Sequence, residues 1–215
     1  MKKFAVVLSG CGVFDGAEIH EATLALLAIA QQGASYEIFA PDIDQYHVIN
    51  HLTRKEMPET RNVLVESARI ARGKIRPLHQ FREKDFDAII FPGGFGAAKN
   101  LSTVAFDGAD ARVNSDVAVA VRSMHKAGKP IGALCIAPAV IARILGHVEV
   151  TIGDDPGTAG AIEKMGGIHI KATHGEVVVD KKNKIFTTPC YMLDATIVQI
   201  YEGARNVVNE IMLNV

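Results

Sequence analysis

The sequence predicts an α/β fold in which a mainly parallel sheet is covered by helices on both faces. Short apolar runs alternate with helical patterns from one end of the 215-residue chain to the other. The runs are continuous in hydrophobicity, which is typical of parallel strands buried on both faces. Glycines close most of the helical patterns, as they commonly do at helix C-termini. This alternation implies right-handed crossovers, and therefore helices on both sides of the sheet.

Each element can be placed from its own pattern. The runs that predict strands are Phe4–Gly10, Tyr36–Ala40, Asp87–Phe91, Pro130–Leu134 and Val148–Ile152. The patterns that predict helices cover Glu18–Gln32, Glu59–Ala71, Asp116–Ala127 and Leu193–Leu213. Val177–Asp180 and Ile185–Thr188 flank a polar turn, which indicates a C-terminal hairpin. The irregular segment from Pro41 to Pro58 exceeds the usual loop length, so we expect it to line a site or to contain a short helix.

Composition limits the expected partners and compartment. With 48% hydrophobic residues, the chain can form one domain over residues 1–215. A formal net charge of -1 gives no electrostatic reason to expect nucleic acid or an anionic membrane, and no apolar stretch is long enough to span a bilayer. The three cysteines, Cys11, Cys135 and Cys190, are widely spaced and odd in number. They argue against a disulfide framework or a metal site, and for the reducing cytoplasm.

Cys135 stands where a predicted strand gives way to a predicted helix. A helix N-terminus offers unpaired N–H groups and a positive dipole end, which favour the thiolate. Small residues on either side, Ala133 and Ala137, fit a tight strand-to-helix elbow, and Pro138 suits a first helical turn. We therefore expect a nucleophilic thiol whose pKa lies well below about 8.5. The alternative is that Cys135 is a small buried hydrophobic residue.

A glycine-rich turn, Pro92-Gly-Gly-Phe-Gly96, follows another predicted strand and should reach the same edge of the sheet. The N–H of Gly94 beside the N–H of Ile136 would form an oxyanion hole next to the Cys135 sulfur, as addition to a carbonyl requires. The alternative for Gly93 and Gly94 is an ordinary tight turn. The turn after the first strand lacks GxGxxG spacing, so it does not indicate a nucleotide site.

These residues carry a family resemblance. The strings Phe91-Pro-Gly-Gly-Phe-Gly-Ala-Ala-Lys-Asn-Leu101 and Ala133-Leu-Cys-Ile-Ala-Pro138 resemble the PfpI-type, class I glutamine amidotransferase-like superfamily. Within it, the segments 9–21, 48–53, 59–63 and 187–192 resemble the ElbB type, called enhancing lycopene biosynthesis protein or isoprenoid biosynthesis glyoxalase. The resemblance covers essentially the whole chain. It implies a flavodoxin-like three-layer sandwich, a Cys135 nucleophile, an acidic partner at Glu18, and oxyanion donors at Gly94 and Ile136.

The chain also departs from glutamine amidotransferases. Those enzymes have glycines on both sides of the cysteine and a Cys-His-Glu triad, whereas this chain has alanines there and no histidine in the segment 151–155. Ammonia release from glutamine is therefore not expected. Further candidates for lining the pocket are Cys11, His20, His51 and Gly93. His20 could equally be a solvated residue, and Cys11 a packed loop residue.

The resemblance and the residues together suggest a reaction. Beside a thiolate, Glu18 would be protonated by like-charge repulsion and desolvation, and could then relay protons; alternatively it serves only the helix dipole. We expect a glutathione-independent glyoxalase that converts the small reactive aldehyde glyoxal to glycolate, without metal or organic cofactor, in a homodimer. The alternatives are a deglycase with the same residues, or a non-catalytic cysteine redox sensor or regulator linked only indirectly to isoprenoid biosynthesis.

Overall fold

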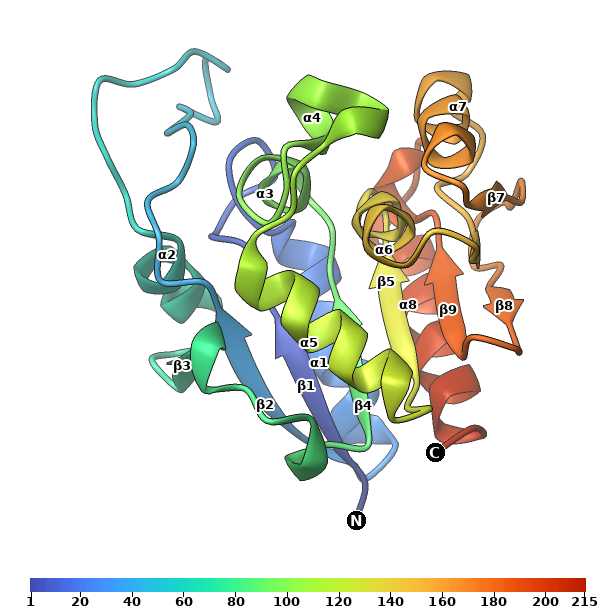
Figure 1. Ribbon diagram of the computed structural model, residues 1–215. Coiled ribbons are helices and arrows are strands. Elements are labelled where there is room, and N and C mark those ends of the chain that lie inside the picture. Colours follow the sequence, from blue (N-terminus) through green and yellow to red (C-terminus); the bar gives the residue numbers. More distant parts are fainter.

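The computed structural model describes all 215 residues and has a seven-stranded sheet between two layers of helices (Figure 1). The strand order is β3-β2-β1-β4-β5-β9-β8, and every pair is parallel except β8 with β9. The strands are β1 (Lys3–Val7), β2 (Ser35–Ala40), β3 (Ile75–Pro77), β4 (Ala88–Phe91), β5 (Ile131–Leu134), β8 (Val178–Asp180) and β9 (Ile185–Thr188). The structure confirms the expected three-layer sandwich and its C-terminal hairpin.

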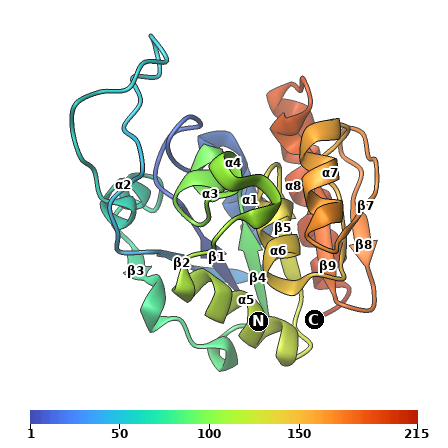
Figure 2. The ribbon, with the colours of Figure 1, turned by 45° about the horizontal axis from the view of Figure 1, so that its top comes forward.

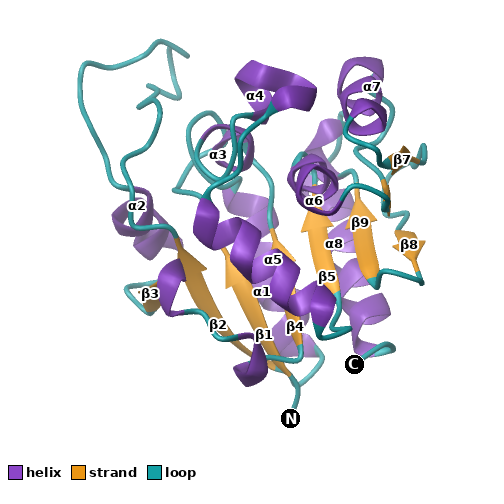
Figure 3. Ribbon diagram, in the orientation of Figure 1, coloured by secondary structure: helices purple, strands orange, loops and turns teal.

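The helices divide between the two faces of the sheet (Figures 2 and 3). On one face lie α1 (Ile19–Gln31), α2 (Val63–Ile70) and α8 (Ile197–Met212); on the other lie α3 (Phe95–Lys99), α4 (Val104–Asp107), α5 (Ser115–Lys126), α6 (Ala137–Leu145) and α7 (Pro156–Lys164). Short 3-10 turns occupy Leu78–Gln80, Glu83–Asp85, Gly108–Asp110 and Cys190–Met192. Successive β1 residues enter the two cores alternately, which explains the unbroken apolar runs. No helix combines the length and the apolar character that crossing a membrane requires.

Two strands differ from the prediction. The run Val148–Ile152 contains only a two-residue strand, β6 (Glu149–Val150), which pairs with β7 (Ile168–His169) outside the main sheet. Beside β5 the main sheet instead has β9, and the N–H of Thr151 donates to the side-chain oxygen of Thr187 at 3.0 Å. The edge strand β3 was not predicted, because three residues ending in proline carry no periodicity.

The long segment after β2 forms an arm that extends beyond the body of the molecule (Figure 1). It contains no helix, and α2 begins at Val63 rather than at the predicted Glu59. Isolated bridges between residues 44 and 62 and between residues 49 and 56 give the arm a hairpin-like form. The arm is fixed to the turn after β1, because the N–H of Ile49 donates to Asp15 Oδ2 at 2.6 Å.

Candidate active site

Cys135 lies directly after β5, at the carboxyl edge of the sheet and the entrance to α6. Its φ of 60° is in the left-handed region, which is strained for a residue with a side chain. Its N–H donates to the carbonyl of Thr188 at 3.0 Å, so the neighbouring strand β9 holds the strained turn in place. This is the sharp strand-to-helix elbow expected from the sequence, and strain of this kind is common at functional sites.

Two backbone donors converge on the Cys135 sulfur. The N–H groups of Gly94 and Ile136 hydrogen-bond it, and each interaction lowers the thiol pKa. Ile136 precedes α6, and Gly94 precedes α3 with a φ of 89°. A side chain at Gly94 would overlap the backbone N of Glu18, so close packing as well as φ requires glycine here. The structure thus brings to the Cys135 sulfur the two N–H groups that the sequence analysis paired, and their role as an oxyanion hole stays a prediction.

Glu21, in the first turn of α1, is the carboxyl group that contacts Cys135. Its side chain lies beside the thiol and has no solvent exposure, and each of the two groups affects the pKa of the other. Its Oε2 accepts the N–H of Gly93 at 2.9 Å, and its Oε1 accepts the N–H of Tyr191 at 3.3 Å. Burial, followed by the nearby charge of Glu18, raises the pKa of Glu21 from 4.5 to about 8. Glu21 is therefore a fixed, mainly protonated group at pH 7.

The partner predicted at Glu18 needs correction. Glu18 is the N-cap of α1, and its Oε2 accepts the N–H of Glu21 at 2.8 Å. Its side chain thus satisfies a free N–H of the first helical turn, the role that the sequence analysis kept as the alternative. Glu21, three residues later, lies on the buried face of the helix with Ala22, Ala25 and Ala28. A carboxyl on an otherwise apolar helix face was the signal that could have identified it.

The expected low pKa of Cys135 is also contradicted. The side chain is only 7% exposed, and burial together with the adjacent Glu21 raises the thiol pKa well above its ordinary value. The donors from Gly94 and Ile136 act in the opposite direction but do not outweigh these effects. Desolvation destabilises the Cys135 thiolate by more than the helix N-terminus stabilises it, so Cys135 is a thiol at rest, beside a protonated carboxyl.

Gly93 and His20 border this site. A Cβ at Gly93 would overlap the Cys135 side chain and lie 2.8 Å from Glu21 Oε2, so only glycine fits between the two groups. His20 is exposed, and its Nδ1 lies 2.8 Å from the hydroxyl of Tyr191. The N–H of Tyr191 in turn donates to Glu21, so Tyr191 links His20 to the buried pair of Glu21 and Cys135. Tyr191 was not identified from the sequence.

Cys11 and His51 belong to a different group of side chains. Burial and the charges of Glu66 and Asp15 raise the pKa of the partly buried Cys11 thiol against the opposing charge of Arg69, and Glu21 is not among the groups that act on it. His51 accepts the N–H of Phe14 at 3.2 Å, and its Nε2 lies 3.8 Å from Asp15 Oδ1. It thus joins the arm to the turn after β1. In contrast Cys190, which was not proposed for the site, is buried near Glu21 and Cys135.

The chain contains no group of three or more histidine, cysteine, aspartate or glutamate side chains arranged to hold a metal ion. The groups in contact at the site are the Cys135 thiol, the buried Glu21 carboxyl with a pKa near neutrality, and two N–H donors at the sulfur. Together they can add sulfur to a carbonyl and move protons on the product.

Comparisons with known proteins place the chain in a family. No family model matches the chain. A human protein named glutamine amidotransferase-like class 1 domain-containing protein 3, mitochondrial, is 48% identical over 220 residues, which cover 98% of this chain and 82% of the relative. A zebrafish (Danio rerio) protein named ES1 protein, mitochondrial, is 37% identical and covers 97% of this chain and 84% of the relative.

Solved structures give a similar result. The crystal structure of an isoprenoid biosynthesis protein with an amidotransferase-like domain from Ehrlichia chaffeensis superposes with a TM-score of 0.94 at 39% identity, covering 100% of this chain and 99% of the other. A glyoxalase III from Candida albicans superposes with a TM-score of 0.65, covering 99% and 97% of the two chains. Its identity of 13% shows a shared fold alone.

The cytoplasmic location expected from the cysteines is contradicted by the curated relatives, whose names include the word mitochondrial. Free cysteines indicate a reducing environment, and they do not distinguish one reducing compartment from another.

At 48% identity over nearly its whole length, and with its sheet, elbow and glycine-rich turn in place, the chain belongs to the glutamine amidotransferase-like class 1 family that includes the ES1 proteins.

Proposed function

We propose that the protein is a glutathione-independent glyoxalase of the ElbB type, which converts glyoxal and water to glycolate. The observation that carries this proposal is the contact between the Cys135 thiol and the fully buried Glu21 carboxyl, whose pKa is raised to about 8. A pKa near the working pH suits a group that both accepts and donates protons. We also propose that residues 1–215 act as one domain, that the active species is a homodimer, and that no metal or organic cofactor takes part.

In the first step the Cys135 sulfur adds to one aldehyde carbon of glyoxal. The ionised fraction of Glu21 takes the thiol proton as the carbon–sulfur bond forms, and the carbonyl π-electrons move to oxygen. The N–H groups of Gly94 and Ile136, which point at the sulfur, are positioned to stabilise that oxygen. Glu21 then returns the proton to the oxygen, which gives a hemithioacetal.

In the second step Glu21 removes the proton from the carbon bonded to sulfur and delivers a proton to the neighbouring carbon. Between these transfers the intermediate is an enediolate. The hydroxyl proton on the sulfur-bonded carbon passes to the oxygen of the neighbouring carbon, which gives a glycolyl thioester, an isomer of the hemithioacetal. Water then cleaves the carbon–sulfur bond, releases glycolate and restores the thiol. One glyoxal and one water are consumed for each glycolate, and no oxidant or reductant is required.

The burial of Cys135 favours this reaction over the alternatives. A peroxide sensor needs an exposed cysteine of low pKa, whereas this thiol is 7% exposed and its pKa is raised. A deglycase acting on proteins must admit a large modified side chain, and a buried sulfur suits a two-carbon aldehyde better. The fold shared with the Candida albicans glyoxalase III is compatible with the proposal.

The test is glycolate formation from glyoxal without glutathione, measured by chromatography for the wild type and three variants. Cys135→Ser and Glu21→Gln should each lower turnover by about 10²-fold or more, because one removes the nucleophile and the other the proton relay. Cys11→Ser is the matched cysteine control, and it should leave turnover within about twofold because Cys11 lies outside the Glu21 contacts. Wild-type turnover no higher than that of Cys135→Ser would exclude the enzyme.

A further inference from the structure

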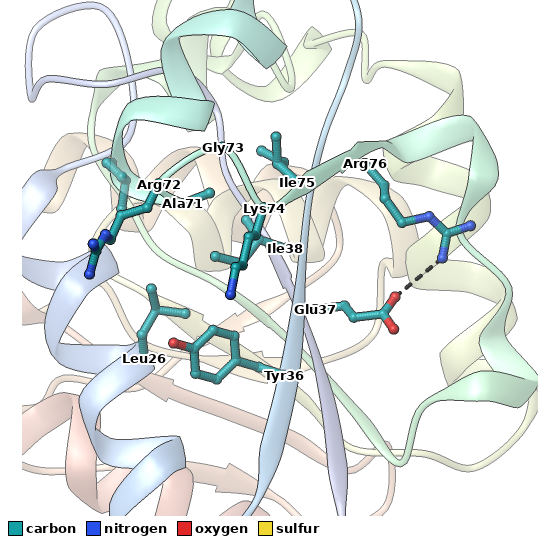
Figure 4. A pocket seen from close by; sticks show the side chains of 11 residues that line it. Leu26, Tyr36, Glu37, Ile38, Ala71, Arg72, Gly73, Lys74, Ile75 and Arg76 are labelled. Atoms are coloured by element: carbon teal, nitrogen blue, oxygen red, sulfur yellow. Dashed lines mark hydrogen bonds and ion pairs between the residues drawn. The ribbon is translucent and has the colours of Figure 1, made fainter.

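A hollow of about 730 Å³ lies at the β3 edge of the sheet, away from Cys135. It is bounded by α1, the end of α2, the first half of β2 and the segment that leads into β3 (Figure 4). Tyr36 is near the amino end of β2, whereas Cys135 follows the carboxyl end of β5, so the two sites lie at opposite ends of the sheet. Concave regions of this size are the usual form of small-molecule sites.

The hollow has an apolar floor with an aromatic ring at its side. The floor consists of Leu26, Ile38, Ile70 and Ile75, contributed by four different elements. Tyr36 is 39% exposed, and its hydroxyl makes no hydrogen bond within the protein. Figure 4 shows its ring beside Leu26. A flat apolar ligand could pack on these surfaces.

Two cations at the hollow are free. Four basic side chains occur between residues 69 and 76, and two of them are engaged: Arg69 binds Glu66 at 2.8 Å, and Arg76 binds Glu37 at 3.2 Å. The other two, Arg72 and Lys74, are exposed and form no ion pair or side-chain hydrogen bond. Figure 4 shows the Lys74 ammonium pointing toward Tyr36 and Leu26, and the Arg72 guanidinium beside α1.

The backbone of the turn between α2 and β3, which carries these cations, is strained at Arg72. Arg72 has a φ of 53° and Gly73 a φ of 77°, so two consecutive residues are left-handed. Glycine or asparagine would adopt the first position with less strain than arginine. The strained residue is thus one of the two unpaired cations, which points to a role for its side chain beyond the turn.

We propose that this hollow binds a small amphipathic anion, an aromatic ring system carrying one carboxylate or phosphate. The ring would pack on Tyr36 and the apolar floor, and Arg72 and Lys74 would bind the anionic oxygens. No residue of the hollow takes part in the reaction proposed for Cys135, so binding here and glyoxal turnover can be tested separately.

The probes are 1-naphthyl phosphate and 1-naphthoate, with uncharged 1-naphthol for comparison, titrated into the 215-residue protein by calorimetry. Saturable one-to-one binding of at least one anion, about tenfold tighter than 1-naphthol, is the expected result. The double variant Arg72→Met/Lys74→Met should weaken binding about tenfold, and added salt should weaken it further. Tyr36→Ala should also weaken binding, since the packing surface is lost.

The matched control is Lys181→Met/Lys182→Met, which removes two exposed charges from the hairpin at the other edge of the sheet. It should bind the probes like the wild type. Circular dichroism would establish that each variant is folded. Absence of saturable binding to the wild type, equal binding of the naphthol and the anions, or equal weakening in the two double variants would each overturn the proposal.

Discussion

Replacing Glu21 with glutamine should change how the stability of the protein depends on pH. The folded pKa of Glu21 is about 8, above its ordinary value of 4.5, so between these values the folded state holds a proton that the unfolded state has released. The free energy of unfolding of the wild type must therefore fall as pH rises through this window. Below about pH 4.5 Glu21 does not make the free energy of unfolding depend on pH, and above about pH 8 it causes no further decrease. A glutamine at this position does not titrate, so the Glu21→Gln variant should lack this dependence.

The size of the effect follows from the shift. Each pKa unit corresponds to about 1.4 kcal/mol, so the wild type loses roughly 5 kcal/mol relative to the variant across the whole window. Between about pH 5 and about pH 7.5 the difference is about 3 kcal/mol. The glutamine also has a constant cost, because both Glu21 oxygens accept backbone N–H groups and an amide nitrogen cannot. That cost shifts the stability of the variant at every pH and leaves the slope unchanged.

Thermal unfolding of both proteins, followed by circular dichroism at several pH values, measures this slope. For a chain of this length 1 kcal/mol corresponds to about 2–4 °C, so the difference in Tm should change by roughly 6–12 °C in favour of the variant between those pH values. Glu210→Gln, which removes a carboxyl without an ion pair on α8, should run parallel to the wild type. A constant Tm difference between the wild type and Glu21→Gln would refute a Glu21 that is protonated in the fold.

Three further predictions concern the same site. Glu18→Ala should lower stability in thermal unfolding by about 1 kcal/mol and leave glyoxal turnover within a fewfold of the wild type, because Glu18 is a helix cap. A loss of turnover of about 10²-fold would instead assign the proton relay to Glu18. Alkylation of Cys135 by iodoacetamide, followed by mass spectrometry, should be slower than alkylation of free cysteine from about pH 7 to about pH 9, because the thiol pKa is raised. Labelling of Cys135 as fast as that of free cysteine in this range would contradict the raised pKa. Gly93→Ala should lower stability by about 1–3 kcal/mol and abolish turnover, because its methyl group would overlap Cys135. The control is Gly160→Ala, at a position with open space around it. Equal Tm values for the two variants would argue against tight packing at Gly93.

Much of the fold was predictable because its signals are local. Continuous apolar runs identified β1, β2, β4 and β5, and the polar turn before Ile185 identified the hairpin. The elbow at Cys135 followed from a change of pattern within a few residues. β3 and the separate β6–β7 pair were not predictable in this way, because strands of two or three residues depend on what lies beside them.

The site was predictable in its backbone and less so in its side chains. Gly94 and Ile136 donate from main-chain positions that the fold class fixes, so locating the two turns located the donors. The identity of the acid depended on which of two glutamates, Glu18 or Glu21, turns inward, and that depends on where α1 begins. The thiol pKa depended on burial, which the helix-terminus argument did not include.

The raised pKa of Glu21 is the property on which the proposed reaction depends most. In the sequence of steps the carboxyl accepts a proton from Cys135, gives it to oxygen, accepts one from carbon and gives it to the neighbouring carbon. With the ordinary pKa of 4.5 it would be ionised at pH 7 and a poor donor; with a pKa far above 8 it would be a poor acceptor. Burial on the apolar face of α1 raises the value, and the N–H groups of Gly93 and Tyr191 limit the rise. The same burial keeps Cys135 protonated at rest, so the thiol becomes a nucleophile only as its proton passes to Glu21. A substrate that is already an electrophilic aldehyde is the kind of partner for which such a shielded thiol is sufficient.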